Sequence, residues 1–373
     1  MSSTHLGMSS TFTNKPHFVL LDGLRGVAAL IVVVYHLFEC YDWSPMPRGY
    51  LAVDFFFVLS GFVIGYAYDD RWSSGLTTWQ FARRRLIRLH PMVVLGAVIG
   101  VVAFLLQGAT KWTGIAVPLS TVLCALVLNL VMCPLSSDST LDVRGNGEMF
   151  PLNGPNWSLF FEYLGNVCYA LLLRFLPTRW LAGLVLLLSG GIIALSVHEG
   201  YLGVGWTMAE GGFWYGMLRM LLPYSIGMLM ARKFKPLKLQ STFWPSTLTL
   251  LFVATFPLLL GHMPMWMSGL YDALCVIVVF PFVVWMGASA AHLQPQALRH
   301  LGRLGDLSYP LYAVHYPLMY YFYAHIGFSG SLVPIAHFAD SCVMMGIVFV
   351  LSIALAYAAF HLYDRPIRRW LNR

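Results

Sequence analysis

Charged side chains are scarce in this chain. They make up only 10% of its 373 residues, whereas 58% of the residues are hydrophobic. A water-soluble domain carries about 25% charged residues. The composition therefore excludes an ordinary soluble globular protein and predicts a polytopic protein of the lipid bilayer. The length leaves room for one integral bundle and little for a separate soluble domain.

Closely spaced cysteines are also missing. The six cysteines are scattered and no CxxC occurs, so the sequence predicts neither a metal site nor a disulfide framework. Residues 1–17 lack the basic and apolar regions of a cleaved leader and are expected to form a cytoplasmic tail. The net charge of +7 is concentrated in the loops, which indicates membrane orientation and no nucleic-acid partner.

Apolar stretches of the length that crosses a bilayer, about 17–25 residues, occur eleven times. They are 18–38, 50–68, 89–107, 115–133, 157–176, 180–198, 213–231, 244–262, 268–288, 306–326 and 338–362. The clusters of Lys and Arg between them belong in the cytoplasm by the positive-inside rule, and the acidic loops then lie outside.

The number of crossings follows from these charges. Between the arginine cluster at 83–88 and the acidic loop at 134–156 the chain must cross an odd number of times, yet two stretches fit. We therefore predict that 89–133 crosses once and that one piece of it is broken, interfacial or re-entrant. The result is an all-α bundle of about ten transmembrane helices, with both termini cytoplasmic. The transmembrane domain is 18–363 and a basic tail 364–373 follows; the alternative is eleven crossings.

Arg25 and His36 lie in one apolar segment with ten residues between them. Ionisable residues are costly in a bilayer, so their presence within a span indicates function. Eleven positions make almost three helical turns, which places both side chains within about 20° of one face and about 16 Å apart. His36 is a candidate general base. Arg25 is a candidate anion-binding cation or, paired with Asp22, an anchor of the helix end.

A run of arginines, FARRRLIRLHP, follows the second apolar stretch. Arg83, Arg84, Arg85 and Arg88 are spaced so that at least two guanidinium groups share a helical face. Guanidinium groups bind phosphate through two parallel hydrogen bonds. The run predicts a cradle for a phosphorylated cytoplasmic donor, with an ordinary cytoplasmic anchor as the alternative.

Glu162, in the segment NGPNWSLFFEY, is the candidate acid. We expect it near the outer end of its span, as we expect His36 near the outer end of the first span. A carboxylate beside an imidazole fixes its tautomer and raises its basicity, so Glu162 is expected to orient His36. The alternative is a structural ion pair between Glu162 and an arginine.

Four further residues are candidates for substrate binding. Asn156, Trp157 and Ser158 fit sugar hydrogen bonds and stacking, or an interfacial belt with a helix cap. His315, in LSYPLYAVH, is a second imidazole within a predicted span. Its alternative role is that of a hydrogen-bonded residue inside the bundle.

Six motifs in this order carry a family resemblance. They are Arg25-x10-His36, DFFFVLSGFVI at 54–64, RLHP at 88–91, WSLFFE at 157–162, LSYPLYAVH at 307–315 and YDRP at 363–366. Together they resemble the acyltransferase 3 family of integral membrane O-acyltransferases, in its stand-alone form. His90 and Asp364 depart from the residues that are most common at these positions in the family, and neither departure affects the expected chemistry.

The resemblance implies a ten-helix bundle, an acyl-CoA donor in the cytoplasm and an acceptor hydroxyl on an extracytoplasmic glycan. It implies that His36 is the catalytic base, Arg25 its essential partner and Glu162 the essential acid, with Arg85 and Arg88 on the donor phosphates. We therefore expect an acetyl-CoA-dependent O-acetyltransferase of a bacterial inner membrane. Its acceptor is expected to be a surface polysaccharide, an exopolysaccharide or a lipid-linked sugar. No metal is expected, because the thioester is already activated.

Other functions fit part of the pattern. Intramembrane Arg, His and Glu also build proton relays, so a proton-coupled transporter is the main alternative, although no inverted repeat is visible. A lipid-binding scaffold leaves His36 without a role. An acyltransferase that acts on a secreted small molecule is a further alternative. Direct transfer and an acyl-histidine intermediate both agree with the sequence.

Overall fold

The computed structural model describes residues 17–240, 242–257, 263–291, 294–327 and 338–373, so the predicted tail 1–17 lies almost wholly outside it. The regular structure of the described residues is helical, with isolated bridges and no strand, as predicted. The α-helices are α1 (Val19–Phe38), α2 (Ala52–Ser73), α3 (Thr78–Leu106), α4 (Leu119–Leu130), α5 (Asn156–Leu171), α6 (Thr178–Glu199), α7 (Gly212–Lys233), α8 (Phe243–Thr255), α10 (Met265–Leu274), α11 (Phe280–Ala288), α12 (Pro295–His325), α13 (Phe338–Ala358) and α14 (Arg365–Leu371).

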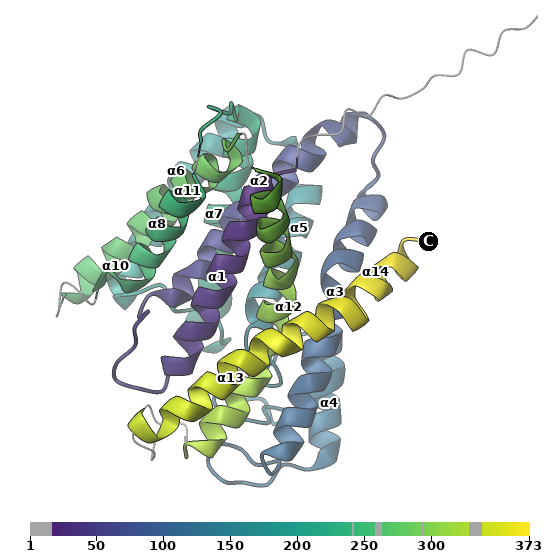
Figure 1. The fold of residues 1–373 in the computed structure, drawn as a ribbon, viewed down its shortest axis with the longest axis vertical. Helices are drawn as coiled ribbons and strands as arrows, with labels where there is room; N and C mark the ends of the chain where they lie inside the picture. The colour runs from purple at the N-terminus through teal and green to yellow at the C-terminus, as the bar shows by residue number, and fades with distance from the viewer. Residues whose placement is uncertain (1–16, 241, 258–262, 292–293, 328–337) are drawn as a thin grey trace, which may run out of the picture.

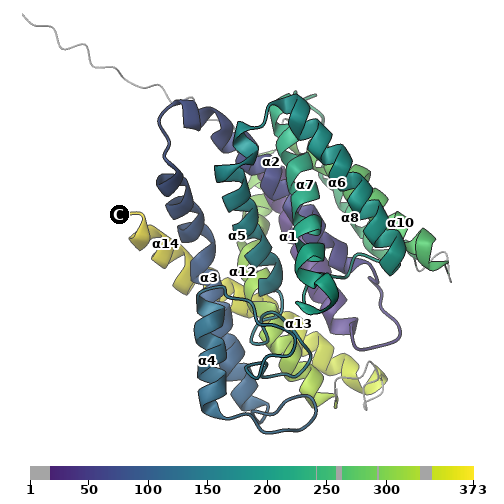
Figure 2. The same cartoon turned by 180° about the vertical axis from the view of Figure 1, so that it is seen from behind.

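The helices form one bundle with a central group between two outer groups (Figures 1 and 2). Helices α1, α2, α5 and α12 lie in the centre. Helices α6, α7, α8, α10 and α11 gather on one side, and α3, α4 and α14 lie on the other. Helix α1 packs along α12 within the centre, and helix α2 packs along α7 of the neighbouring group.

Within the described residues, six helical segments are long and apolar enough to cross a membrane. They are Val19–Phe38, Gly49–Ser73, Thr78–Leu106, Thr178–Glu199, Met265–Ala288 and Ala339–Leu371. Helices α7 and α12 are also long, but they carry ionisable residues, such as Arg219 and His315, that lower their hydropathy. The predicted number of about ten crossings stays a prediction.

Helix α4 is the short helix of the predicted 89–133 region. Its twelve residues rise about 18 Å, less than the roughly 30 Å of a bilayer core. Val122 and Ala125 of α4 pack against Phe104 near the end of α3. Helix α4 therefore lies beside α3 as a half-length helix (Figure 2), and it is not among the candidate spans.

Both ends of the described chain lie at one end of the bundle, which we call the arginine end. His17 contacts Asp22 in the first turn of α1, with 3.1 Å between Nε2 and Oδ2. The carbonyl oxygen of Leu371, at the end of α14, accepts a hydrogen bond of 2.7 Å from Arg83 near the start of α3. A chain that returns to its starting side crosses an even number of times.

The loop 131–155 covers the opposite end of the bundle. The carboxylate of Asp142 accepts hydrogen bonds of 2.8–2.9 Å from the backbone N–H groups of Arg144, Gly145 and Gly147. Both glycines have positive φ, which a residue with a side chain adopts only at a cost. The loop is therefore compact without a helix or strand of its own.

A proline in α12 attaches this loop to the bundle. Pro317 has no N–H, so it leaves the carbonyl of Ala313, four residues earlier, without its helical hydrogen bond. The side-chain amide of Asn153, which is fully buried, donates to that carbonyl at 2.8 Å. The loop thus satisfies a backbone group that the proline exposes.

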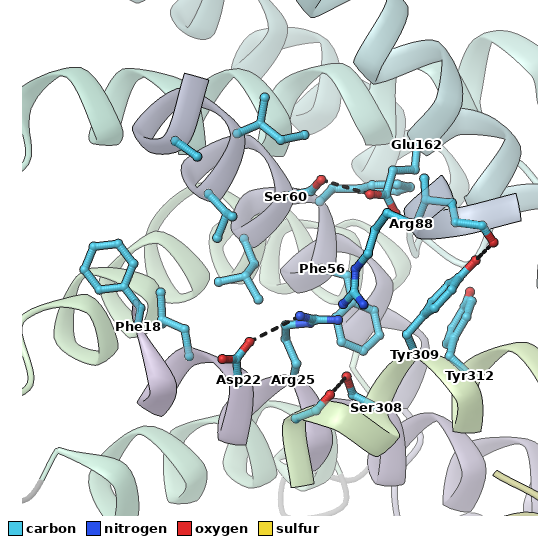
Figure 3. Close-up of a pocket in the computed structure, with 18 of the residues that line it drawn as sticks. Phe18, Asp22, Arg25, Phe56, Ser60, Arg88, Glu162, Ser308, Tyr309 and Tyr312 are labelled. Carbon is cyan, nitrogen blue, oxygen red and sulfur yellow. Dashed lines mark hydrogen bonds and ion pairs between the residues drawn. The ribbon is translucent and has the colours of Figure 1, made fainter. Parts of the chain in front are cut away.

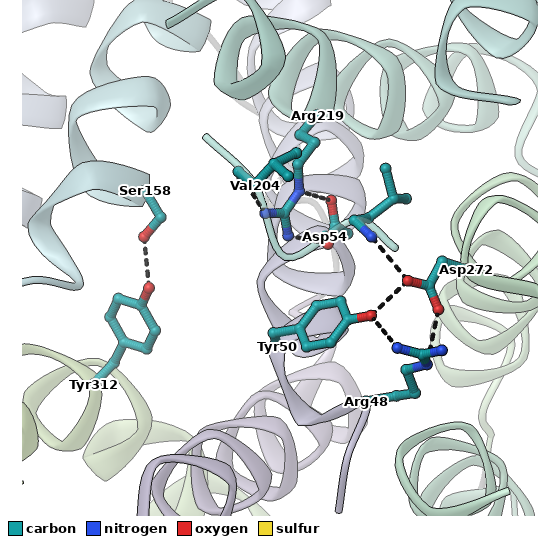
Figure 4. Close-up of polar contacts among 9 residues, drawn as sticks. Arg48, Tyr50, Asp54, Ser158, Val204, Arg219, Asp272 and Tyr312 are labelled. Carbon is teal, nitrogen blue, oxygen red and sulfur yellow. Dashed lines mark hydrogen bonds and ion pairs between the residues drawn. The ribbon is translucent and has the colours of Figure 1, made fainter. Parts of the chain in front are cut away.

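Buried ion pairs join the central helix α2 and the loop before it to the outer helices α7 and α10 (Figure 4). Arg219 of α7 makes two hydrogen bonds of 2.7 and 3.2 Å to Asp54 of α2, and the two side chains are 1% and 0% exposed. Arg48 contacts Asp272 of α10, which also accepts a hydrogen bond of 2.5 Å from Tyr50. Removing one partner from such a pair leaves an uncompensated charge in an apolar place.

Two helix boundaries differ from the predicted spans. Helix α12 begins at Pro295, eleven residues before the predicted span, since polar residues at the arginine end continue the helix beyond the apolar part. The segment 364–373, predicted as a tail, is largely helical, because the π-helical turn Ala359–Asp364 leads into α14 with Pro366 in its first turn. Proline is tolerated at that position.

Helices α2 and α7 approach each other closely at Gly61, so a larger residue at this position tests their packing. A Cβ on Gly61 would lie 2.0 Å from the backbone oxygen of Tyr224, which belongs to α7. Gly61→Ala is therefore expected to destabilise the protein by about 1–3 kcal/mol or more, because neither backbone can yield easily. Thermal unfolding of the purified protein in detergent measures this change.

The matched control is Gly183→Ala on α6, where a Cβ would meet nothing within 4 Å. This substitution is expected to be neutral or to stabilise the helix by up to about 1 kcal/mol. Equal unfolding temperatures for the two variants would contradict the close packing of α2 on α7.

Candidate functional site

Two of the cavities formed by the described residues lie along helix α1, one toward each end of the bundle. The arginine cavity has a volume of about 540 Å³ and its wall includes Arg25, Arg85 and Arg88. The histidine cavity also has a volume of about 540 Å³, and its wall includes His36 and Glu39. Helix α1 contributes to both walls, so Arg25 and His36, almost three turns apart, both point into the bundle but line different cavities.

The arginines reach their cavity from the N-terminal halves of α1 and α3. Helix α3 begins with a capping box in which Thr77 and Gln80 satisfy each other's backbone N–H groups. The arginine run is therefore helical from the start. Arg85 lies 2.8 Å from Glu162, whose Oε1 also accepts a hydrogen bond of 3.1 Å from Ser60 (Figure 3).

Arg88 is a cation of this cavity that makes no ion pair among the described residues. It has no hydrogen bond or ion pair within the described part of the chain, and its guanidinium lies 5.9 Å from the ring centre of Tyr309. Arg25, which pairs with Asp22 at 3.3 Å, lies near enough to repel its charge (Figure 3). Two neighbouring guanidinium groups favour an anion between them.

The arginine run divides into two pairs. Arg85 and Arg88 line the cavity, as predicted for residues on one face. Arg83 and Arg84 are exposed and lie outside its wall. Arg83 instead donates to the carbonyl of Leu371, so the prediction that all four arginines form one cradle is corrected.

The histidine cavity contains an imidazole–carboxylate pair. Nδ1 of His36 lies 2.6 Å from Oε2 of Glu39, one helical turn later. The phenol of Tyr323 donates to the same carboxylate at 3.3 Å and to the backbone oxygen of His36 at 2.5 Å. A carboxylate accepts hydrogen bonds, so Nδ1 carries the proton. Nε2 is then the basic nitrogen of His36.

The predicted contact between Glu162 and His36 is wrong. Glu162 lines the arginine cavity and pairs with Arg85, which was the structural alternative, whereas His36 lines the histidine cavity and pairs with Glu39. Helix α5 begins at Asn156, so Glu162 lies about 9 Å further along the helix axis toward the arginine end. The carboxylate of Glu162 therefore lies closer to the arginine end than the imidazole of His36 does.

The predicted substrate residues separate in the same way. Trp157 lines the histidine cavity and Ser158 lines the arginine cavity. Asn156 lines neither cavity, because its amide is buried and donates to Asn129 at 2.8 Å. His315 is 0% exposed and lines neither cavity. Its Nδ1 donates to backbone oxygens of α12 at 2.9–3.0 Å, and its ring centre lies 5.5 Å from that of His36.

The rest of the histidine cavity is aromatic and acidic. Trp112, Trp206 and Tyr316 form part of its wall, and Tyr316 lies 4.6 Å from His36 between ring centres. Glu148 comes from the loop 131–155 and accepts a hydrogen bond from Tyr320. Burial raises the pKa of Glu148 to about 7, so its carboxyl group is close to half protonated at neutral pH.

Several of these residues were not found from the sequence. Glu39 had a local signal, since a carboxylate three residues after a helical histidine lies on the same face. Tyr312, Tyr316 and Tyr320 also follow one face of α12 at intervals of four. Glu148 had no such signal, because its position depends on how a long loop folds back over the bundle.

Comparison with known proteins gives a family and several relatives. The model of the family described as "Acyltransferase domain" matches residues 18–361. "Protein 2 in picA locus" of Rhizobium radiobacter is 37% identical over 163 residues, which are 41% of this chain and 81% of that protein. No solved structure matches the chain.

Two relatives have names that describe an activity. The peptidoglycan O-acetyltransferase OatA of Listeria monocytogenes is 38% identical over 95 residues, 25% of this chain and 15% of that protein. A putative O-acetyltransferase of Staphylococcus aureus is 41% identical over 92 residues, 23% of this chain and 14% of that protein. These matches cover only a small part of both relatives. The family model spans nearly the whole chain, and the chain therefore belongs to the acyltransferase 3 family.

Proposed function

We propose that this membrane acyltransferase moves an acetyl group from cytoplasmic acetyl-CoA to a hydroxyl group of an extracytoplasmic glycan or lipid-linked sugar. The observation that carries the proposal is the pair of cavities at the two ends of helix α1. The arginine cavity presents guanidinium groups, and the histidine cavity presents an imidazole that Glu39 orients. A donor and an acceptor can therefore approach the same centre from opposite sides of a membrane.

The arginine cavity suits the phosphates of a CoA molecule. Arg88 makes no ion pair among the described residues, whereas Arg25 pairs with Asp22 and Arg85 pairs with Glu162. The same cavity wall contains the hydroxyl groups of Ser60 and Ser308. Phosphate oxygens accept charge-assisted hydrogen bonds from such guanidinium groups. The positive-inside rule assigns this end to the cytoplasm, where acyl-CoA is made, and places both termini there.

The distance between the cavities suits the arm of the donor. The rise of α1 from Arg25 to His36 is about 16 Å, and an extended pantetheine arm is on the order of 20 Å long. Phosphates bound at the arginine end thus allow the thioester to reach the imidazole. The nucleotide does not have to enter the apolar part of the bundle.

His36 then supplies the chemistry. Nε2 takes the proton of the acceptor hydroxyl, the oxygen attacks the thioester carbonyl, and the carbon–sulfur bond breaks as the sulfur leaves with the proton from the imidazolium. Glu39 keeps the proton on Nδ1 and stabilises the imidazolium. Transient acylation of His36 followed by transfer to the hydroxyl uses the same groups.

The histidine cavity suits a sugar that carries no negative charge. Its aromatic wall offers apolar ring faces, and the carboxyl groups of Glu39 and Glu148 accept hydroxyl hydrogen bonds. The guanidinium in this wall, Arg219, is neutralised by Asp54. An anionic acceptor would approach carboxyl groups without a free cation among the described lining residues, which is unfavourable in a site of low polarity.

The donor half is tested by acetyl-CoA binding to the purified protein. Arg88→Ala is expected to weaken binding about 10- to 100-fold, since a hydrogen bond to a charged group contributes about 1.5–3 kcal/mol. His36→Ala is expected to bind acetyl-CoA as the wild type does and to lose transfer. Isothermal titration calorimetry measures binding, and release of CoA thiol in acceptor-containing membranes measures turnover.

Arg179→Ala is the matched control for Arg88→Ala. Arg179 is an exposed arginine near the start of α6 that lines neither cavity, so its loss is expected to leave binding unchanged. If folded wild-type protein binds no acyl-CoA, the donor assignment is wrong. A proton-coupled transporter then explains the intramembrane Arg and His residues better.

The orienting role of Glu39 is tested by measuring kcat and the KM for acetyl-CoA separately in a Glu39→Gln variant. Glu39→Gln is expected to lower kcat about 100-fold or more with little change in the KM for acetyl-CoA, because only the orientation and charge stabilisation of His36 are lost. Glu162→Gln is the comparison and is expected to weaken donor binding, since Glu162 fixes Arg85. A Glu39→Gln enzyme with wild-type kcat would rule out this role.

A further inference from the structure

Two residues belong to the walls of both cavities. Val53 of α2 and Tyr312 of α12 line the arginine cavity and the histidine cavity alike. A residue shared by two adjoining cavities separates them. The side chains at this level are therefore what prevents the two spaces from forming one passage between the ends of the bundle.

Hydrogen bonds of the Tyr312 phenol hold the partition, and the longer of them, 3.5 Å, goes to the backbone oxygen of Pro155. The phenol oxygen of Tyr312 lies 2.6 Å from Oγ of Ser158, on α5 (Figure 4). Ser158 also lies 2.9 Å from the backbone oxygen of Pro155, and the ring of Phe56 packs edge-on against Tyr312 with 5.7 Å between ring centres. Three helices, α2, α5 and α12, thus meet at the ring of Tyr312.

A bilayer protein needs this separation when no donor is bound. Both cavities have polar walls, and a continuous polar passage would let water and protons move along it. The proposed function nevertheless requires an acyl-pantetheine arm to cross this level, because Arg88 lies on one side and His36 on the other. The side chain of Tyr312 can leave the passage by changing its rotamer, since a tyrosine has several staggered rotamers. A barrier formed by helix backbone could not move in this way.

We propose that Tyr312 is a movable plug that closes the passage on Ser158 and that the pantetheine arm of the donor displaces it and fills its place. This inference rests on the proposed function for the identity of the displacing group. The closure itself does not depend on any reaction. The passage is sealed by Tyr312 in the free protein and by the donor during transfer.

Proton leak through proteoliposomes tests the plug without requiring catalysis. The wild type, Tyr312→Ala, Tyr312→Phe and Ser158→Ala are reconstituted with a pH-sensitive dye inside, and the decay of an imposed pH gradient is measured. Tyr312→Ala is expected to leak severalfold faster than the wild type. Tyr312→Phe and Ser158→Ala, which keep the ring and lose the hydrogen bond, are expected to fall between the two.

Tyr357→Ala is the control for the loss of a tyrosine ring. Tyr357 lies exposed on α13, outside both cavities, so its variant is expected to leak at the wild-type rate. Equal leak rates for folded Tyr312→Ala, Tyr357→Ala and wild-type protein would overturn the plug. Circular dichroism and thermal unfolding confirm that each variant is folded before reconstitution.

A second measurement separates the plug from the donor. Coenzyme A added at the arginine end of Tyr312→Ala vesicles is expected to slow the leak, because the arm occupies the open passage. A fast leak that coenzyme A does not slow would support closure by Tyr312 and overturn its displacement by the donor. Binding of coenzyme A to the same vesicles then shows whether the proposed donor site has failed as well.

Discussion

The arrangement of this bundle depends on how charges are held where water is scarce. A charge inside an apolar bundle is tolerated when a counter-charge and hydrogen bonds accompany it. Asp54 with Arg219 joins α2 to α7, and Glu162 with Arg85 joins α5 to α3. These pairs fix which helix faces meet. Arg88 makes no such ion pair among the described residues, and it lies in the cavity wall where an anionic ligand would supply the counter-charge.

The sequence predicted the features that depend on a single helix. The spacing of Arg25 and His36 placed both side chains on one interior face, because helical periodicity holds over three turns. The contact of Glu162 with His36 failed because it required the relative depth of two helices. Glu39 was not found from the sequence, although its spacing from His36 already placed it one turn away on the same face.

The remaining parts of the site depend on contacts between distant segments. The wall formed by Glu148 requires the loop 131–155 to fold over the bundle, and Pro317 determines where Asn153 attaches it. Hydropathy detects neither contact, since the loop is polar and the proline lies within a helix. The same limit applies to the number of crossings, because α12 combines apolar turns with ionisable residues that serve the site.

The continuity of α1 also has a consequence for the size of a donor. An unbroken helix cannot stretch, so the rise of about 16 Å between Arg25 and His36 is constant. Under the proposed function, a thioester on a much shorter arm cannot reach the imidazole while its phosphates stay bound. The binding energy of the nucleotide then assists the reaction only for donors of matching length. Under the same proposal, the first helix thereby favours donors whose arm matches this rise over truncated thioesters.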